Sequence, residues 1–168
     1  MFAIEALPIN VAESEKTIQV VANIEAEVQP QDAWSYQVLL ELLEQDSIDM
    51  LIVYKQEKEE WTEDKQVIGY CLYQVVFEQA EILRIGTHPK YQRQGMASQL
   101  FDRLHEVLQS NQVESLLLEV RADNHGAIAL YERQNFVVIH KRKGYYRTLH
   151  QSSHQAAVDA LIMQRVYN

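Results

Sequence analysis

The chain has few of the features that would place it in a membrane or outside the cell. It contains one cysteine, Cys71, which forms no disulfide within the chain. Because Cys71 lies in the apolar stretch 68–77, where a thiol resists ionisation, we expect it to be a packing residue. No apolar run is long enough to cross a bilayer, and the first ten residues lack the basic stretch that opens a signal peptide. We therefore expect a cytoplasmic protein without membrane contact.

Basic residues are scarce in the first half. Residues 1–82 carry 4 Lys and Arg against 17 Asp and Glu, whereas residues 83–168 carry 11 against 7. The halves thus have charges of −13 and +4, and the net charge of −9 argues against nucleic acid as the main partner. The acidic half would attract a cationic amine or a basic peptide. An ordinary solvated surface rich in glutamate explains the same charge equally well.

Helical and strand patterns alternate along the 168 residues, with no internal repeat. Helices are predicted over 9–28 and 32–44, separated at Pro30, with Asp32 as the N-cap of the second. Further helices are predicted from Met96 to Leu108 and over 124–133. Strands are predicted over 48–54, 67–77, 81–87, 115–120, 136–141 and 159–166, and the run 55–65 as a solvated loop. This order predicts a single α/β domain, residues 1–168, with a mixed central sheet of six to seven strands and about four helices.

One turn has the chemistry of a phosphate site. The segment Gln92-Arg93-Gln94-Gly95-Met96-Ala97 follows an apolar strand and opens a helix. Gly95 lets the backbone approach a ligand closely, and unpaired N–H groups at a helix start favour a phosphate oxygen. Its single glycine fits neither a Walker loop nor a dinucleotide fingerprint. By spacing alone, a diphosphate site and an ordinary glycine-capped loop are about equally supported.

Three motifs together resemble the GNAT acetyltransferases. Gln92-x-x-Gly95-x-Ala97 is similar to their acetyl-coenzyme A pyrophosphate loop, Gln/Arg-x-x-Gly-x-Gly/Ala. With Leu118-Glu119-Val120-Arg121-Ala122-x-Asn124 and Ala127-Ile128-Ala129-Leu130-Tyr131-Glu132, the match closely resembles the bacterial ribosomal-protein-alanine N-acetyltransferases of that family. The resemblance is good over 67–147 and looser before it, where 30–35 echoes the family's Pro-Trp-Ser loop. It implies the GNAT fold.

The resemblance also implies how acetyl-coenzyme A would bind. The family uses the strand before the loop to pair with the pantetheine amides, and the loop to hold the phosphates through backbone N–H groups. The strand residues are Ile85, Gly86 and Thr87, and the loop residues are Arg93, Gln94, Gly95, Met96, Ala97 and Ser98. Gly86 suits a close approach by the cofactor, and Ala97 replaces the second glycine of the usual loop. Asn124 matches an asparagine that contacts the cofactor.

Two side chains suit the chemistry of acetyl transfer, in which a neutral amine attacks a thioester and a thiolate departs. Glu119 lies near the end of an apolar strand, where a carboxylate is costly without a task or a partner. Tyr131 lies seven residues after Asn124, about two helical turns, so both would face one ligand. The family's matching residues are the general base and the general acid. The competing roles are an ion pair of Glu119 with Arg121 and a core aromatic for Tyr131.

The acceptor site is predicted between the loop 29–36 and a turn at Gly144-Tyr145-Tyr146, with Trp34 and Tyr146 as walls. Core packing of these aromatics is an equal alternative. His150 and His154 lack a third ligand, so no metal is assigned. The expected acceptor is the N-terminal alanine of a small-subunit ribosomal protein, bound by a monomer or weak dimer. Alternatives are a lysine side chain, a small polyamine, and a non-catalytic acetyl-coenzyme A sensor.

Overall fold

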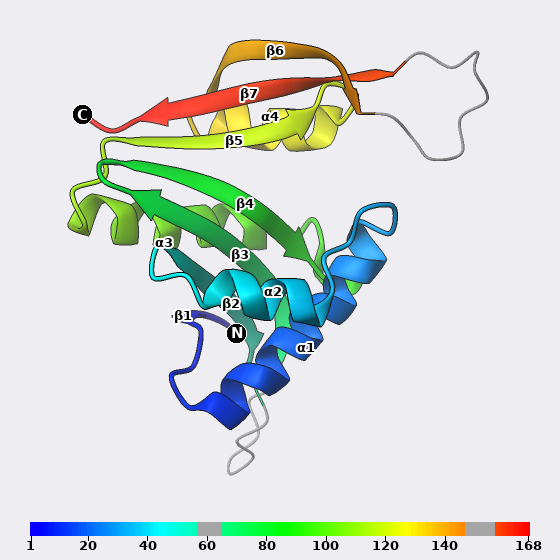
Figure 1. Cartoon of the computed structure of the whole chain (residues 1–168), viewed down its shortest axis with the longest axis vertical. Helices are drawn as coiled ribbons and strands as arrows, with labels where there is room; N and C mark the ends of the chain where they lie inside the picture. The colour runs from blue at the N-terminus through cyan, green and yellow to red at the C-terminus, as the bar shows by residue number, and fades with distance from the viewer. Residues whose placement is uncertain (57–64, 147–156) are drawn as a thin grey trace. The chain divides into compact units, whose positions relative to one another are not determined.

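The computed structural model describes residues 1–56, 65–146 and 157–168. In these ranges, strands and helices alternate as the sequence predicts, with one additional strand at the N-terminus (Figure 1). In chain order they are β1 (Phe2–Ala6), α1 (Val11–Val28), α2 (Tyr36–Leu43), β2 (Ile48–Lys55), β3 (Gln66–Val76), β4 (Gln79–Thr87), the 3-10 helix η1 (Pro89–Tyr91), α3 (Met96–Ser110), β5 (Ser115–Arg121), α4 (His125–Arg133), β6 (Val137–Tyr146) and β7 (Val158–Val166).

The strands form one mixed sheet of seven in the order β1-β2-β3-β4-β5-β7-β6 over the described ranges. β4 pairs with β5 in parallel, whereas β1 with β2, β2 with β3, β5 with β7, and β6 with β7 are antiparallel. The predicted α/β class with a mixed sheet and four α-helices is confirmed. The residues fall into two compact units: a first unit of 1–74 and 83–107, and a second unit of 75–82 and 108–168.

The first unit is built on the apolar strands β2 and β3. Residues 50–54 of β2 are all buried, as expected for a strand covered on both faces. Helices α1 and α2 lie on one face of these strands and α3 lies behind them in Figure 1. α1 places Ile18, Val21 and Ile24 in the core. It is capped by Asn10, whose side chain accepts a hydrogen bond from the Glu13 N–H.

The start of α2 differs from the prediction. Asp32 is not its N-cap, because the helix begins at Tyr36 and is capped by Ser35, whose hydroxyl accepts from the Val38 N–H at 3.3 Å. The Asp32 carboxylate instead lies 3.4 Å from the Arg84 guanidinium. Asp32, which local spacing had assigned to the helix start, therefore pairs with Arg84 from a distant strand.

The second unit is built on β5, β7 and β6, with α4 alongside β5 and β7 in Figure 1. β5 alternates strictly, so that Leu116, Leu118 and Val120 are buried while Glu119 lies on the more open face. β6 is longer than predicted. The expected turn at 144–146 is wrong: these residues are the last of β6, with Gly144 at φ 61° beside a register shift.

Two further outcomes concern the chain's composition. Cys71 is fully buried in β3 and burial raises the pKa of its thiol, which confirms a packing role. No helix in the described ranges is long and apolar enough to cross a membrane.

Candidate functional site

The predicted phosphate loop lies in the first unit and is shaped by two residues with positive φ. Arg93 has φ 61° and Gly95 has φ 77°, and α3 begins directly afterwards at Met96. A Cβ on Gly95 would meet no atom within 4 Å, so the backbone conformation, and not crowding, requires glycine there. The segment 92–95 is exposed. Open space beside first-turn N–H groups fits a diphosphate.

The side chains of the loop contribute unequally. Met96 is 2% exposed and packs into the core, so its side chain is not available to a ligand. Ala97 and Ser98 are half-buried in the first turn of α3. Gln94 donates its side-chain N–H to the Lys90 carbonyl at 3.3 Å. Arg93 is exposed and is the cation among the predicted loop residues.

Gln92 fixes the loop to the preceding strand. Its Nε2 donates to the Thr87 carbonyl at 3.0 Å, across the single turn of η1. His88 caps that turn, since its Nδ1 accepts from the Lys90 N–H at 3.2 Å. The glutamine of the loop motif therefore has a structural task. It closes the connection between β4 and α3 and sets the direction in which the loop leaves the strand.

A contact inside the protein, which the sequence does not show, requires glycine at position 86. A Cβ at this position would lie 2.5 Å from the hydroxyl oxygen of Tyr70 on β3, so a larger residue is excluded from inside the protein. Its neighbours Ile85 and Thr87 are half-buried in β4. The expected use of Ile85, Gly86 and Thr87 by an extended amide ligand stays a prediction, but the glycine is explained without a ligand.

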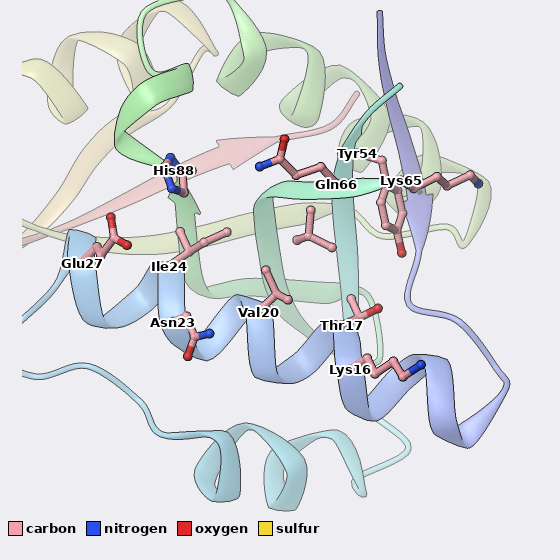
Figure 2. Close-up of a pocket in the computed structure, with 11 residues that line it drawn as sticks. Lys16, Thr17, Val20, Asn23, Ile24, Glu27, Tyr54, Lys65, Gln66 and His88 are labelled. Carbon is pink, nitrogen blue, oxygen red and sulfur yellow. The ribbon is translucent and has the colours of Figure 1, made fainter. Parts of the chain in front are cut away.

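A groove of about 470 Å³ runs along α1 in the first unit (Figure 2). Its lining is mixed, with the apolar Val20 and Ile24 beside basic and acidic residues such as Lys16, Lys65 and Glu27. Lys65 is already paired with Glu5 at 2.8 Å. None of the residues predicted for the cofactor or the acceptor lines this groove, so it is assigned to neither ligand.

Glu119 lies in the second unit, where two residues of β6 hold its carboxylate. The Arg142 guanidinium lies 3.1 Å from Oε2, and the Tyr146 hydroxyl donates to Oε1 at 3.3 Å. β7 separates β5 from β6, and the long side chains reach over it: Glu119 lies opposite Ile162, and Arg142 opposite Ala160. The Glu119 side chain is 26% exposed, so it is oriented and still accessible.

Arg121, the competing partner of Glu119, makes two hydrogen bonds of 3.0 Å with Asp123. Its guanidinium also lies 5.1 Å above the Tyr146 ring, and Arg142 lies 3.9 Å above the Tyr145 ring. The sequence did not single out Arg142, because its contact with Glu119 spans 23 positions. The basic run 140–143 on the last-but-one strand was the available signal.

A second carboxylate lies close to Glu119. Glu81 of β4 is paired with Leu117, and side chains alternate along a strand, so Glu81 shares a face with Leu117 and Glu119. Burial and the negative charge of Glu119 raise the pKa of the Glu81 carboxyl above its ordinary value. Sequence patterns did not single out Glu81, because its neighbour on the sheet comes from a strand more than thirty positions away.

Tyr131 and Asn124 lie at opposite ends of α4. Tyr131 is 8% exposed, with its ring 6.0 Å from that of Phe136. Asn124 is the N-cap, and its Oδ1 accepts from the Ala127 N–H at 3.2 Å. Helical spacing from Asn124 therefore does not apply, since it precedes the first helical residue. Its exposed side chain retains an amide N–H₂ group that can donate to a ligand.

The predicted acceptor walls belong to different units. Trp34 is half-buried in the first unit, packs against the core cluster, and has the Arg84 guanidinium 4.2 Å above its ring. Tyr146 is half-buried in the second unit, and its hydroxyl donates to Glu119. Each aromatic thus has packing contacts within its own unit, and their use as walls of one pocket stays a prediction.

The described ranges contain no group of three or more His, Cys, Asp and Glu residues that could hold a metal ion. His150 and His154 lie outside those ranges.

Comparisons with known proteins identify the family of the chain. The model of the acetyltransferase (GNAT) family matches residues 20–136. The [ribosomal protein bS18]-alanine N-acetyltransferase of Escherichia coli K12 is 37% identical over 102 residues, which is 61% of this chain and 66% of that protein. The match thus spans just under two thirds of that relative. The Haemophilus ducreyi protein of the same name is 32% identical over 103 residues, 61% of this chain and 71% of its own.

A solved structure is similar over nearly the whole chain. The crystal structure of the ribosomal-protein-S18-alanine N-acetyltransferase from Escherichia coli has a TM-score of 0.79 and 27% identity. It covers 99% of this chain and 94% of its own.

Proposed function

Because this chain belongs to the GNAT acetyltransferase family, we propose that it transfers acetyl from acetyl-coenzyme A to the N-terminal alanine of a small-subunit ribosomal protein. The observation that carries the proposal is Glu119. It stands at the position of the family's general base, accessible to solvent and held in one orientation by Arg142 and Tyr146. A carboxylate oriented in this way can accept a proton at a defined point.

Glu119 acts as the general base. An α-amine has an ordinary pKa of about 7.7 to 8.0, so a useful fraction is neutral near pH 7, and a lysine amine near 10.4 is almost all charged. As the neutral nitrogen bonds to the acetyl carbon, Glu119 takes its proton, directly or through one water. Arg142 and Tyr146 keep the carboxylate from rotating away during this step.

Tyr131 acts as the general acid. When the bond between the acetyl carbon and sulfur breaks, the leaving thiolate takes the hydroxyl proton of Tyr131, and solvent then restores that proton. Burial to 8% exposure fixes the ring in place on α4. Cys71 is fully buried, and burial raises the pKa of its thiol, so an acetyl-enzyme on this residue is disfavoured and direct attack in a ternary complex is preferred.

The first unit holds acetyl-coenzyme A. The N–H groups from Gly95 to Ser98 bind the diphosphate, and the exposed Arg93 adds a positive charge. The β4 backbone at Ile85, Gly86 and Thr87 pairs with the pantetheine amides. Asn124 is proposed as a cofactor contact because it matches the family's asparagine. The chain works as a single acetyltransferase domain, residues 1–168, as a monomer or weak dimer in the cytoplasm without nucleic acid.

The acidic residues of the first half favour a basic acceptor. Residues 1–82 have a charge of −13, which attracts a basic ribosomal peptide by its field as well as by contact. The same field would attract a lysine-rich peptide or a polyamine, so the acceptor must be identified by competition between substrates and not by charge.

The test is coenzyme A release from acetyl-coenzyme A with three acceptors side by side. These are a ribosomal peptide beginning with alanine, its N-terminally blocked twin that keeps a lysine, and spermidine. Selective turnover of the free alanine peptide supports the proposal. Turnover only of the blocked peptide or of spermidine keeps the reaction and replaces the substrate, and release with none of the three favours a non-catalytic acetyl-coenzyme A sensor.

A further inference from the structure

Arg84 of β4 joins its strand to the connection between α1 and α2. Its Nη1 donates to the Gln29 side chain at 2.7 Å, and its Nη2 donates to the Asp32 carbonyl at 2.9 Å. The guanidinium also lies 4.2 Å above the Trp34 ring. All of these residues belong to the first unit, and the Arg84 side chain is only 13% exposed. One side chain thus holds three positions of an otherwise irregular segment.

A buried carboxylate lies beneath these contacts. Glu25 of α1 is fully buried, with its Oε1 3.2 Å from Arg84 Nε and 3.4 Å from the Trp34 N–H that donates to it. The Arg84 Nε–H is not aimed at Glu25, so this contact is an ion pair and not a hydrogen bond. A carboxylate is buried at such cost only when a charge and donors compensate it.

Tyr70 extends the same set of contacts to β4. Its hydroxyl donates to Glu25 Oε2 and occupies the space where a Cβ of Gly86 would lie. Burial, and then the charge of Glu25, raise the pKa of the Tyr70 hydroxyl, so it remains a neutral donor. The residues Glu25, Gln29, Asp32, Trp34, Tyr70 and Arg84, here named the Arg84 cluster, therefore connect the β4 backbone at 85–87 with the segment that carries Trp34.

We propose that Arg84 is a positioning residue for the acceptor: it fixes the segment 29–35, and with it Trp34, against β4. The inference rests on the proposed function, in which Trp34 forms part of the acceptor site. An irregular segment must lose conformational freedom to bind a ligand, and Arg84 supplies that order before the acceptor arrives. Its loss should weaken acceptor binding and leave acetyl-coenzyme A binding, which uses 85–87 and 93–98, largely unchanged.

The test compares Arg84→Met, which keeps most of the apolar stem, with Arg84→Lys and a control. Arg103→Met is the matched control, because Arg103 is 48% exposed on α3 and its guanidinium pairs with Glu106 in the next turn. For Arg84→Met we expect the acceptor KM to rise about tenfold and the acetyl-coenzyme A KM to change less than about twofold. Arg84→Lys should recover only part of the loss, because an ammonium lacks the planar fork.

A second readout does not depend on activity. Hydrogen exchange at the Trp34 N–H, and the emission of Trp34 with Trp61 replaced by Phe, report whether the segment is held. In Arg84→Met, exchange should become faster and the emission should shift, and Arg103→Met should resemble the parent. If Arg84→Met fails to fold, Gln29→Ala removes the 2.7 Å contact alone and should produce the same changes to a smaller degree.

The outcomes separate this inference from the function it rests on. Faster exchange together with a selective rise in the acceptor KM supports it. Unchanged exchange, or equal rises in both KM values, overturns it. If the parent protein turns over no acceptor, the proposed function fails and the role of Arg84 in acceptor binding fails with it, whereas the exchange result still shows whether Arg84 holds the segment.

Discussion

The first unit would use mainly backbone groups in the proposed reaction, whereas the second unit would use mainly side chains. In the first unit, the candidate cofactor residues would bind through backbone groups. Gly86 lacks the Cβ that would collide with Tyr70, Gly95 has a positive φ, and the Met96 side chain is buried in the core. In the second unit, the candidate catalytic groups are side chains, and Glu119 is oriented by residues of another strand. Substitutions in the phosphate loop of the first unit should therefore alter cofactor binding, and those at Glu119 and Tyr131 of the second should alter turnover.

The largest effect is expected at Glu119. Glu119→Gln keeps the size of the side chain and removes the base, so kcat should fall by about 10² to 10³ at neutral pH. Binding of acetyl-coenzyme A, measured by calorimetry, should change little. Glu114→Gln is the control, since Glu114 is an exposed glutamate of the same unit. A loss of cofactor affinity equal to the loss of rate would remove the distinction between the units.

The next effect is expected at Tyr131. Tyr131→Phe keeps the buried ring and removes the proton donor, so release of coenzyme A should slow by about 10- to 100-fold. The measurement is single-turnover kinetics, which separates chemistry from binding, with Tyr167→Phe as the control in the same unit. An unchanged single-turnover rate would assign Tyr131 to packing alone.

A smaller effect is expected at Gly95. Gly95→Ala meets no steric obstacle, but it places a side chain at φ 77°, at a cost of about 1–2 kcal/mol. The acetyl-coenzyme A KM should rise up to about tenfold while kcat stays within about twofold of the parent. Gly126→Ala is the control, because it also has open space and lies within α4 at an ordinary helical φ. Equal KM values for both variants would argue against a phosphate site at this turn.

The smallest effect is expected at Glu81, as a dependence of stability on pH. Its pKa is raised in the folded state, so ionisation of Glu81 opposes folding and the cost appears as pH rises above the ordinary value of 4.5. Because Glu81 is only partly shielded from solvent, water weakens both the burial effect and the repulsion by Glu119. Glu81→Gln should therefore be more stable than the parent by only a few tenths of a kcal/mol at pH 7. Urea unfolding at pH 7 and pH 4 should show this gain shrinking at the lower pH, and a constant gain would rule out the repulsion.

Local patterns predicted most of the fold. The bounds of α3, α4, β2 and β5 follow from spacing and burial within one element, and the structure agrees to within two or three residues. β1 was missed because its five residues are recognised by their pairing with Leu51–Lys55, nearly fifty positions away, and not by their own pattern. The N-cap of α2 was misplaced because Arg84 binds Asp32.

The candidate site also contains one part that local sequence predicts and one part that depends on distant strands. The phosphate loop depends on a helix start and a positive φ, which a short sequence reveals through Gly95. The partners of Glu119 depend on the order of strands β5, β7 and β6, which places Arg142 and Tyr146 beside it. The sequence suggested Arg121, two positions away, as a partner of Glu119. It could not predict Arg142, because β7 lies between the strands of Glu119 and Arg142.

The most direct measurement uses one acceptor peptide with two amines, a free N-terminal alanine and an internal lysine. The peptide is incubated with acetyl-coenzyme A and the protein, and tandem mass spectrometry locates the added acetyl group. Acetyl on the alanine nitrogen, lost in Glu119→Gln and kept in Glu114→Gln, is the predicted result. Acetyl on the lysine, or acetyl on alanine at an equal rate in Glu119→Gln, would contradict the account.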